Sequence, residues 1–273
     1  MKQAAFIGTG NMGGALARAA CRAAGPEQVI LSNRTREKAD ALAAELGCTA
    51  ADNEEAVRQA RYIFLGVKPQ MMRGLLDTLA PVLRKCHEAG ADKVLISMAA
   101  GLRIDDMRPH LLQAGYDVPL LRIMPNTCAA IGMGMTALSA PEGAEEAHLQ
   151  VVEELLSQTG RVERVPEELL DQFTSIAGCG PAYVYPFIEA LADGGVAIGL
   201  PRGQALTYAA QTVLGAAAMV LETGKHPGQL KDEVCSPGGS TIAGVASLER
   251  SGLRAAAIGA VLAAYRRNGE LGK

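Results

Sequence analysis

Two glycine-rich turns offer bare backbone amides that could hold an anion. The first reads GTGNMG at residues 8–13 and has the G-x-G-x-x-G spacing of dinucleotide-binding sites. It follows an apolar strand pattern and opens a helical one, which is the context that this spacing requires. Gly8 would permit the tight turn, Gly10 would let the backbone approach a pyrophosphate, and Gly13 would allow close helix packing. An ordinary glycine-rich turn is the alternative, and the context favours the dinucleotide site.

The end of the second apolar strand discriminates between the nicotinamide cofactors. An NAD site usually offers Asp or Glu there for the ribose hydroxyls, whereas this sequence reads LSNRT at 31–35. Ser32, Asn33 and Arg34 carry no negative charge, and a guanidinium beside a hydroxyl suits a 2′-phosphate. The alternative is that Arg34 is a solvated residue at a helix start. The pattern favours NADP(H) and leaves NAD(H) open.

Three further strand ends could face the same ligand. They read GVKP at 66–69, SMAAG at 97–101 and MPNT at 124–127. In doubly wound sheets, ligands bind at the carboxyl ends of the strands. Small side chains in MAAG would let a flat nicotinamide lie against backbone, and Lys68 could approach a cofactor phosphate or a substrate carboxylate. Each segment alone could be a plain strand-to-helix turn, but together they predict one site.

The second glycine-rich turn, SPGGST at 236–241, opens a late helix. Gly238 and Gly239 remove side chains that would screen the first amides of that helix, and Ser240 and Thr241 add hydroxyls at the same end. Such a helix start predicts a seat for a small carboxylate. A plain connection between two helices is the alternative.

The reaction is constrained by which proton donors the sequence lacks. Reduction of a ketone by hydride creates an alkoxide and needs a strong acid, usually Lys or His. The candidate donors lie outside the apolar helices, and the three histidines before residue 166 are expected at the surface: Lys225, His226, Lys231, Lys273, His87, His110 and His148. A protonated imine is already electrophilic, so its reduction can rely on orientation and one hydroxyl near the nitrogen. This favours reduction of a C=N bond.

An alternation of short apolar runs and helical patterns would position these residues up to about residue 165. It predicts an α/β fold, in which residues 1–165 form a Rossmann-type, doubly wound, mostly parallel sheet with helices on both faces. The predicted strands are 3–8, 28–33, 62–67, 93–99 and 119–125, followed by edge strands at 133–140 and 161–166. The predicted helices are 12–24, 35–46, 53–60, 70–85, 103–114 and 144–158.

From residue 166 to residue 273 the periodicity predicts an all-α domain. The predicted helices are 167–177, 181–198, 202–223, 240–249 and 253–268. Stretches such as LGAAAMV at 214–220 bury little apolar area per residue. We therefore expect an obligate dimer that shares these helices.

Composition removes several other classes of protein. The 273 residues carry a formal net charge of −3 without a Lys/Arg-rich run, so no nucleic-acid partner is expected. The six cysteines are scattered without C-x-x-C spacing, which predicts neither a disulfide framework nor a metal site. The apolar stretch at 207–221 falls short of the roughly 20 residues of a membrane span, and no signal-peptide pattern precedes residue 3. A soluble, cytoplasmic protein is expected.

Taken together, the motifs resemble the pyrroline-5-carboxylate reductase family along the whole chain. The resemblance is carried by FIGTGNMG, FLGVKP, MAAG, MPNT and two long blocks at 178–202 and 226–244. It implies NADPH-dependent reduction of the C=N bond of 1-pyrroline-5-carboxylate to L-proline, the last step of proline biosynthesis. It also implies a Rossmann domain followed by a helical domain that interlocks with a partner in a homodimer, with dimers stacked into decamers in some members.

The resemblance assigns roles to individual positions. The implied cofactor contacts are Ile7, Gly8, Thr9, Gly10, Asn11, Met12, Ser32, Asn33, Arg34, Asn53, Val67, Lys68, Pro69, Met98, Ala99 and Ala100. Gly239, Ser240 and Thr241 would hold the substrate carboxylate at the dimer interface. Thr241 would hydrogen-bond the ring nitrogen, either as the proton donor or only to orient the ring.

The sequence also departs from the family pattern. Glu233 stands where many members have Asn, which puts a substrate contact there in doubt, and Cys179, Met98 and Cys128 replace common Ser, Cys and Pro residues. None of these changes removes a group that imine reduction requires. Two other interpretations remain: a hydroxyacid dehydrogenase of similar two-domain build, and a non-catalytic NADP(H)-binding sensor.

Overall fold

The computed structural model describes residues 1–271 of the chain and divides into two compact units. One unit contains residues 1–179 together with the segment that begins at Tyr265, and the other spans Gly180–Ala264. Every strand of the described residues lies in the first unit, whereas the second is helical.

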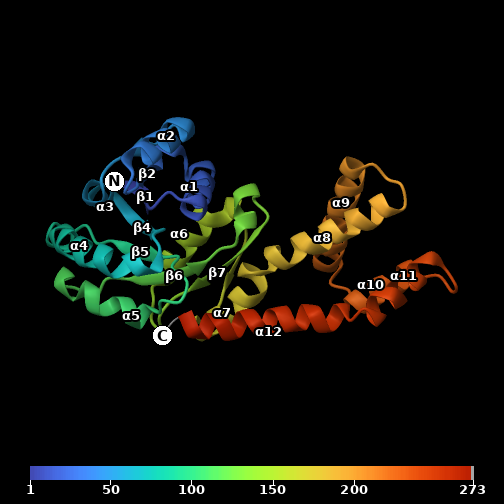
Figure 1. Ribbon diagram of the computed structural model, residues 1–273. Coiled ribbons are helices and arrows are strands. Elements are labelled where there is room, and N and C mark those ends of the chain that lie inside the picture. Colours follow the sequence, from blue (N-terminus) through green and yellow to red (C-terminus); the bar gives the residue numbers. More distant parts are fainter. Residues whose placement is uncertain (272–273) are drawn as a thin grey trace. The chain divides into compact units, whose positions relative to one another are not determined.

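The first unit is built on one sheet of eight strands in the order β3-β2-β1-β4-β5-β6-β7-β8 (Figure 1). Neighbouring strands run parallel except β6 and β7, which are antiparallel. Since β1 lies between β2 and β4, the winding reverses at β1, and the prediction of a doubly wound, mostly parallel sheet is confirmed. The strands are β1 (Lys2–Ile7), β2 (Val29–Ser32), β3 (Thr49–Ala50), β4 (Ala60–Leu65), β5 (Val94–Ser97), β6 (Leu120–Met124), β7 (Gly134–Ser139) and β8 (Gly160–Arg164).

Helices cover both faces of this sheet. Residues of α1, α2 and α6 belong to the apolar cluster on one face, and residues of α3, α4 and α5 belong to the cluster on the other. The helices of the first unit are α1 (Asn11–Ala24), α2 (Arg36–Leu46), α3 (Asn53–Gln59), α4 (Pro69–Glu88), α5 (Ile104–Met107), α6 (Glu146–Leu156) and α7 (Leu170–Phe173).

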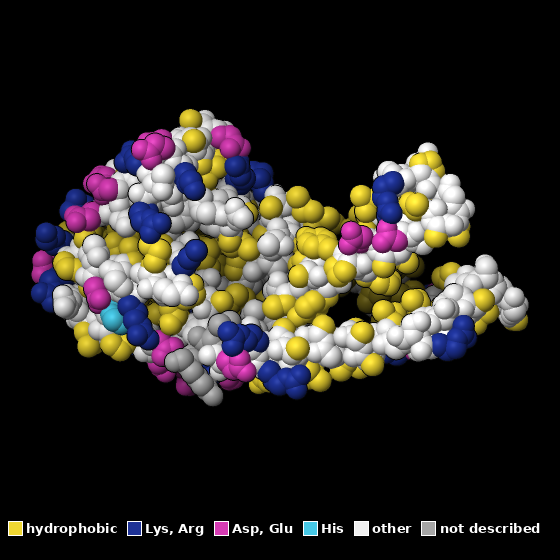
Figure 2. Space-filling view, viewed as in Figure 1, with side chains coloured by type: hydrophobic (Ala, Val, Ile, Leu, Met, Phe, Trp, Pro, Cys, Tyr) yellow, Lys and Arg dark blue, Asp and Glu magenta, His cyan; other side chains and the backbone are white. Residues whose placement is uncertain are grey.

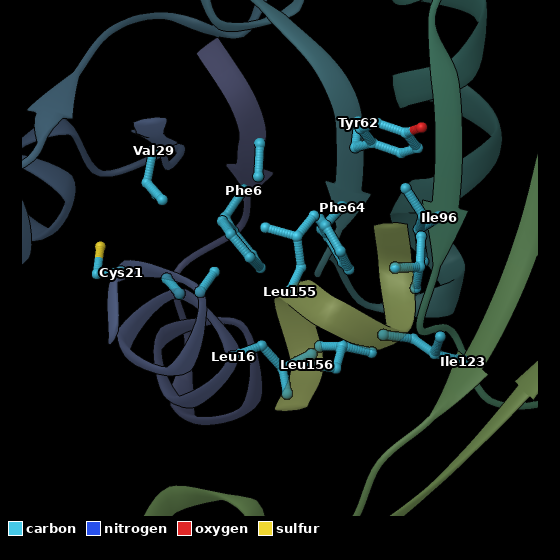
Figure 3. Packing of buried hydrophobic residues seen from close by; sticks show 14 of the residues in the cluster. Phe6, Leu16, Cys21, Val29, Tyr62, Phe64, Ile96, Ile123, Leu155 and Leu156 are labelled. Carbon is cyan, nitrogen blue, oxygen red and sulfur yellow. The ribbon is translucent and has the colours of Figure 1, made fainter. Parts of the chain in front are cut away.

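The central strands β1, β2, β4 and β5 are mostly apolar because successive side chains point into opposite clusters. Phe6 and Phe64 lie in one cluster, where their rings stack with centroids 4.5 Å apart (Figure 3). Ala5 and Ile63, one position before each of them, lie in the other cluster. This double burial holds the carboxyl ends of β1 and β4 side by side.

The structure differs from the sequence prediction at several places in the sheet unit. It misses β3, whose two residues pair with β2 and are too few to show periodicity. β7 is not an edge strand, because β8 pairs with its outer side. The predicted helix 103–114 is α5 followed by a 3-10 turn over Arg108–Ala114, which has a proline in its first turn.

In the helical unit, α8 (Gly180–Ala197) and α9 (Arg202–Thr223) form a hairpin. Three buried alanines, Ala192, Ala205 and Ala209, let the two helices approach closely. The helices that follow are α10 (Pro227–Val234), α11 (Ser240–Arg250) and α12 (Leu253–Leu271), the last of which continues into the first unit.

Two helical stretches also differ from the prediction. Helix α10 is not among the predicted helices, because its start, HPG, has the composition of a turn. Pro227 occupies the first helical turn, and Nδ1 of His226 accepts the Gly228 N–H at 3.0 Å as a cap. The predicted helix 167–177 is instead a 3-10 turn over Glu167–Leu169, then α7, then a wide π turn over Thr174–Gly178.

Large apolar side chains remain exposed on the helices and turns of this unit (Figure 2). Ile198, Leu221 and Ile258 are 83%, 64% and 61% exposed. Helix α9, with 22 residues, is long and apolar enough to cross a membrane by length and composition. The argument that this stretch is too short for a span is therefore wrong, although one such helix is weak evidence for a span. Exposed apolar faces of this kind are typical of surfaces that another chain or a membrane buries.

Candidate functional site

A cleft of about 680 Å³ lies at the carboxyl ends of β1, β2 and β4 in the first unit. Its volume falls in the range of small-molecule sites. The predicted cofactor residues that line it are Ile7, Gly8, Thr9, Gly10, Asn33, Arg34, Asn53, Val67 and Lys68. It is also lined by Thr35, Lys38, Gly66, Met71, Gly74, Leu75 and Thr78, which the sequence analysis does not single out.

Three glycines pack backbone against backbone beneath this cleft. Gly8 has a φ of +95°, and a Cβ on it would lie 2.6 Å from the carbonyl oxygen of Gly66. A Cβ on Gly66 would lie 2.5 Å from the carbonyl oxygen of Gly8, and a Cβ on Gly13 would overlap that same oxygen. Side chains at these three positions would push the turn after β1 away from the turn after β4.

The start of α1 has no capping side chain. Gly10 is the N-cap residue, no side chain caps the helix, and no acidic residue lies in its first turn. The first backbone N–H groups therefore lack a capping acceptor, and the helix dipole adds partial positive charge. A Cβ on Gly10 would meet no atom within 4 Å. This arrangement fits the pyrophosphate of a dinucleotide.

Hydrogen bonds between neighbouring turns hold the end of β2 in place. The Ser32 hydroxyl donates to Oδ1 of Asn53 at 2.7 Å, and Oδ1 of Asn33 accepts the Thr9 N–H at 3.3 Å. These bonds link the turns that carry the predicted pyrophosphate and ribose contacts.

The cleft is positively charged. Arg34, Lys38 and Lys68 line it, and no carboxylate is among its lining residues in the described chain. This charge suits a phosphorylated ribose better than the free hydroxyls of NAD. Lys38 lies in the first turn of α2, four residues after Arg34, and a second cation so close behind LSNRT is the sequence signal that could have found it.

Some predicted cofactor residues do not line the cleft: Asn11, Met12, Ser32, Pro69, Met98, Ala99 and Ala100. Met98 is nevertheless adjacent, because its N–H donates to Leu65 at the end of β4 at 3.3 Å. Its sulfur lies 3.4 Å from the place that a Cβ on Gly66 would take. Ala99 is buried, with its N–H donated to the Ser97 hydroxyl at 3.3 Å.

The second glycine-rich turn lies in the helical unit, and the cleft includes none of its residues. Gly238 has a left-handed φ of +68°, and Gly239 is the N-cap of α11, which no side chain caps. Ser240 and Thr241 are exposed in its first turn. The structure thus places Gly239, Ser240 and Thr241 together at an open helix start.

The histidines and the groups that could bind a metal can be compared with the sequence predictions. His148 was predicted at the surface, but it is buried, with 6% of the residue exposed. Its Nδ1 is hydrogen-bonded to the buried Tyr62 hydroxyl at 3.1 Å, and burial lowers its pKa. Nδ1 of His87 and Nδ1 of His110 lie at hydrogen-bond distance from carboxylate oxygens of Asp92 and Asp77, at 2.6 and 2.7 Å. Lys273 lies outside the described residues. Within residues 1–271, no group of three or more His, Cys, Asp or Glu side chains could hold a metal ion.

Comparison with known proteins agrees with this geometry. Residues 167–271 match a family model described as pyrroline-5-carboxylate reductase dimerisation, and residues 3–101 match one described as NADP oxidoreductase, coenzyme F420-dependent. A pyrroline-5-carboxylate reductase of Pisum sativum is 41% identical over 268 residues, which cover 97% of this chain and 94% of the relative. The chain belongs to the pyrroline-5-carboxylate reductase family.

The chain is similar to another curated reductase of this family and to a solved structure. A reductase of Synechocystis is 45% identical over 251 residues, covering 91% of this chain and 89% of the relative. A crystal structure of Plasmodium falciparum pyrroline carboxylate reductase with NADP bound has a TM-score of 0.85 at 30% identity, covering 100% of this chain and 98% of that one.

Glu233 departs from the common pattern of the reductase family, and its charge is neutralised locally. Nζ of Lys225 donates to its carboxylate at 2.8 Å, and Nε2 of Gln229 donates at 3.1 Å. The Lys225 hydrogen bond in particular holds the pKa of Glu233 below its ordinary value. This carboxylate is therefore ionised at neutral pH and paired with the Lys225 ammonium.

Among the motifs shared with the reductase family, MPNT does not line the cleft. Nδ2 of Asn126 donates to the carbonyl oxygen of Ala177 at 2.9 Å, and its Oδ1 accepts the Met135 N–H at 3.3 Å. The side chain therefore ties the end of β6 to the π turn at Thr174–Gly178. Neither this motif nor SMAAG lines the cleft, so the idea that the three strand ends face one ligand stays a prediction.

The sequence did not predict an ion pair between a buried arginine and a partly exposed glutamate. Arg122, in the middle of the apolar run PLLRIMP, is 4% exposed and pairs with Glu167 at 2.7 Å. A charged residue inside an otherwise apolar strand is the signal that could have identified it, since such a charge requires a partner.

Proposed function

We propose that this protein catalyses the NADPH-dependent reduction of the C=N bond of 1-pyrroline-5-carboxylate to L-proline, the last step of proline biosynthesis. Family membership along the whole chain carries the proposal. The positively charged cleft supports it, because its lining suits a phosphorylated dinucleotide and lacks the carboxylate of an NAD site. NADP(H) is the preferred cofactor in this proposal, and NAD(H) the weaker one.

The turn after β1 would hold the cofactor. In this proposal Ile7, Gly8, Thr9, Gly10, Asn11 and Met12 surround the pyrophosphate, and Ser32, Asn33, Arg34 and Asn53 bind the phosphorylated ribose. Lys38 would join Arg34 at the 2′-phosphate, because both line the same cleft. Val67, Lys68, Pro69, Met98, Ala99 and Ala100 would line the path to the nicotinamide. NADPH, when bound, supplies the hydride.

The start of α11 would hold the substrate. Its open amides at Gly239 and Ser240 suit a carboxylate, and Thr241 carries a hydroxyl at the same helix end. The Thr241 hydroxyl would hydrogen-bond the ring nitrogen while the carbon of the C=N bond accepts hydride and the nitrogen keeps its proton. Because the protonated imine is already electrophilic, orientation would suffice and no strong buried acid is needed.

The assembly in this proposal is a homodimer in which helices of the second unit cover one another. The exposed apolar side chains of α8, α9 and α12 support it, since a partner chain would bury them. This cover would replace lipid around α9, so we propose an enzyme of the cytoplasm rather than of a membrane. We also propose that the substrate site lies at the dimer interface, that dimers can assemble further, and that the functional division is at residues 165/166.

A steady-state assay tests the function. NADPH oxidation should depend on 1-pyrroline-5-carboxylate and yield proline, and 3-hydroxyisobutyrate-type acids should not reduce NADP⁺. Turnover of the hydroxyacid alone would favour the hydroxyacid dehydrogenase. NADPH binding without turnover of either substrate would favour the sensor. Sedimentation of the wild type as a monomer would refute the dimer.

A further inference from the structure

The ion pair between Arg122 and Glu167 lies at a structurally specific point of the sheet unit. Nη1 of Arg122, on β6, donates to Oε1 of Glu167 at 2.7 Å, and only 5% of the arginine side chain is exposed. A buried charge of this kind is costly and rarely adds net stability over an apolar pair. Its presence therefore points to a task other than stability.

Glu167 also fixes the start of α5. The same Oε1 atom accepts the Ile104 N–H at 2.8 Å, while the Arg103 N–H donates to Asp106 at 2.9 Å. Two carboxylates thus hold the backbone directly after Gly101, whose φ is +74°. The loop Met98–Gly101, between β5 and α5, is anchored at its far end by this arrangement.

A serine hydroxyl lies at the near end of the loop, on the strand that pairs with β6. Strand register places Ser97 of β5 and Ser139 of β7 directly opposite Arg122. Paired residues point to the same face of a sheet, so the three polar side chains form a row. The Ser97 hydroxyl accepts the Ala99 N–H at 3.3 Å, and Gly101, Arg122 and Glu167 line one cavity of about 280 Å³.

We propose that Arg122 and Glu167 are positioning residues for the nicotinamide half of the cofactor. They hold the far end of the loop Met98–Gly101 through the Ile104 N–H, without touching the cofactor. This inference rests on the proposed function, because it takes that loop as the surface against which the nicotinamide lies. The adenine half, bound at the turns after β1 and β2, is independent of the pair.

The test compares the intact cofactor with a fragment that lacks nicotinamide. Glu167→Gln keeps an oxygen that can accept the Ile104 N–H but removes the counter-charge of Arg122. The Kd for NADPH is expected to rise about tenfold, because a carboxamide pairs less strongly with Arg122, so the loop is held less firmly and the nicotinamide loses part of its contact with it. The Kd for 2′-phospho-ADP-ribose should stay within about twofold of the wild type, since in this proposal the pair does not touch the adenine half. Misplacement of the nicotinamide should also lower kcat by about tenfold or more and increase the isotope effect with NADPH deuterated at the transferred hydrogen.

Arg122→Lys is the second variant and should show the same pattern more weakly, because an ammonium keeps the charge but not the planar donor group. Arg164→Met is the matched control, since it removes an arginine from an exposed ion pair with Glu146 and Glu153 of the same unit. The proposal is overturned if the fragment loses as much affinity as NADPH, or if Glu167→Gln behaves like Arg164→Met. A wild type that does not reduce 1-pyrroline-5-carboxylate would refute the proposed function, and the two Kd comparisons would still decide the positioning role.

Discussion

Replacement of Arg34 by alanine is expected to change cofactor preference rather than cofactor binding in general. Arg34 lines the cleft after β2, in the position where an NAD site would carry a carboxylate. Its guanidinium is exposed, and no carboxylate lines the same cleft in the described chain. NADPH and NADH differ only in the 2′-phosphate, so the ratio of their kinetic constants isolates this one contact.

The magnitude follows from charge and exposure. A pair of unit charges at about 4 Å is worth about 1 kcal/mol in water and more where solvent is excluded. A phosphate monoester carries nearly two charges at neutral pH, so an exposed Arg34 would contribute about 2 kcal/mol, or about thirtyfold in affinity. Lys38 and Lys68 line the same cleft and would retain part of the preference.

The measurement is kcat/KM for NADPH and for NADH at low and high salt. Arg34→Ala should lower the NADPH/NADH ratio by about ten- to a hundredfold, with the smaller effect at high salt because exposed charges are screened. Arg36→Ala is the control, since Arg36 pairs with Asp40 and does not line the cleft. Equal losses with both cofactors, or the same change in Arg36→Ala, would show that Arg34 does not bind the 2′-phosphate.

Three other perturbations follow from the structure. Gly10→Ala should leave the free energy of unfolding within about 0.5 kcal/mol of the wild type, because a Cβ there meets no atom within 4 Å. It should nevertheless raise the Kd for NADPH about tenfold or more. Denaturant unfolding and cofactor titration check the two values, and an unchanged Kd would contradict pyrophosphate binding at this helix start. Lys93 is fully buried, and its ammonium donates a hydrogen bond to the Arg58 carbonyl oxygen at 3.0 Å. Burial lowers the pKa of Lys93 below the ordinary 10.5. The unfolded chain therefore binds that proton more tightly than the native state does. Burying the charged ammonium destabilises the native state fully below the folded pKa, and this destabilisation disappears as the pH rises past 10.5. Lys93→Met should accordingly be more stable than the wild type by about 1–3 kcal/mol at neutral pH, with a gain that shrinks toward alkaline pH; a gain independent of pH in denaturant unfolding would refute this account. Thr241→Ala should lower kcat about tenfold or more while the Kd for NADPH stays unchanged, and Thr241→Ser should recover most of the activity; a loss of NADPH affinity in Thr241→Ala would argue against a substrate role.

The sheet could be predicted because its strands are buried on both faces, which makes their apolar runs continuous. The same reasoning fails where that burial is absent or partial. β3 pairs through two residues only, and α10 begins at His226 and Pro227, whose cap and first-turn roles are visible only once the backbone is folded. His148 was expected at the surface because polar residues surround it in sequence, but a tertiary partner, Tyr62, makes its burial tolerable.

The candidate cofactor site was largely predictable because its determinants are local. Glycine spacing, strand ends and the missing acid after β2 are all read within short segments of sequence. The contacts that position these segments are not local. Arg122 meets a partner 45 residues away, and Gly66 is required because Gly8 and Gly13 pack against it. Neither relation has a period or spacing that a single sequence reveals.

The glycines of the two turns are required for different reasons, and this affects how far each turn supports a ligand. Gly8 needs a left-handed φ, and Gly66 meets backbone that cannot move, so both are explained within the chain. Gly10 has an ordinary extended conformation and open space around it, which leaves an approaching ligand as the reason for glycine. Gly239 is also extended, but a Cβ there would press on the Ser236 hydroxyl, so packing already accounts for part of its requirement. Substitution of Gly239 would therefore mix packing with binding, and the substrate role of the α11 start depends on Thr241, whose exposed hydroxyl has no such structural duty.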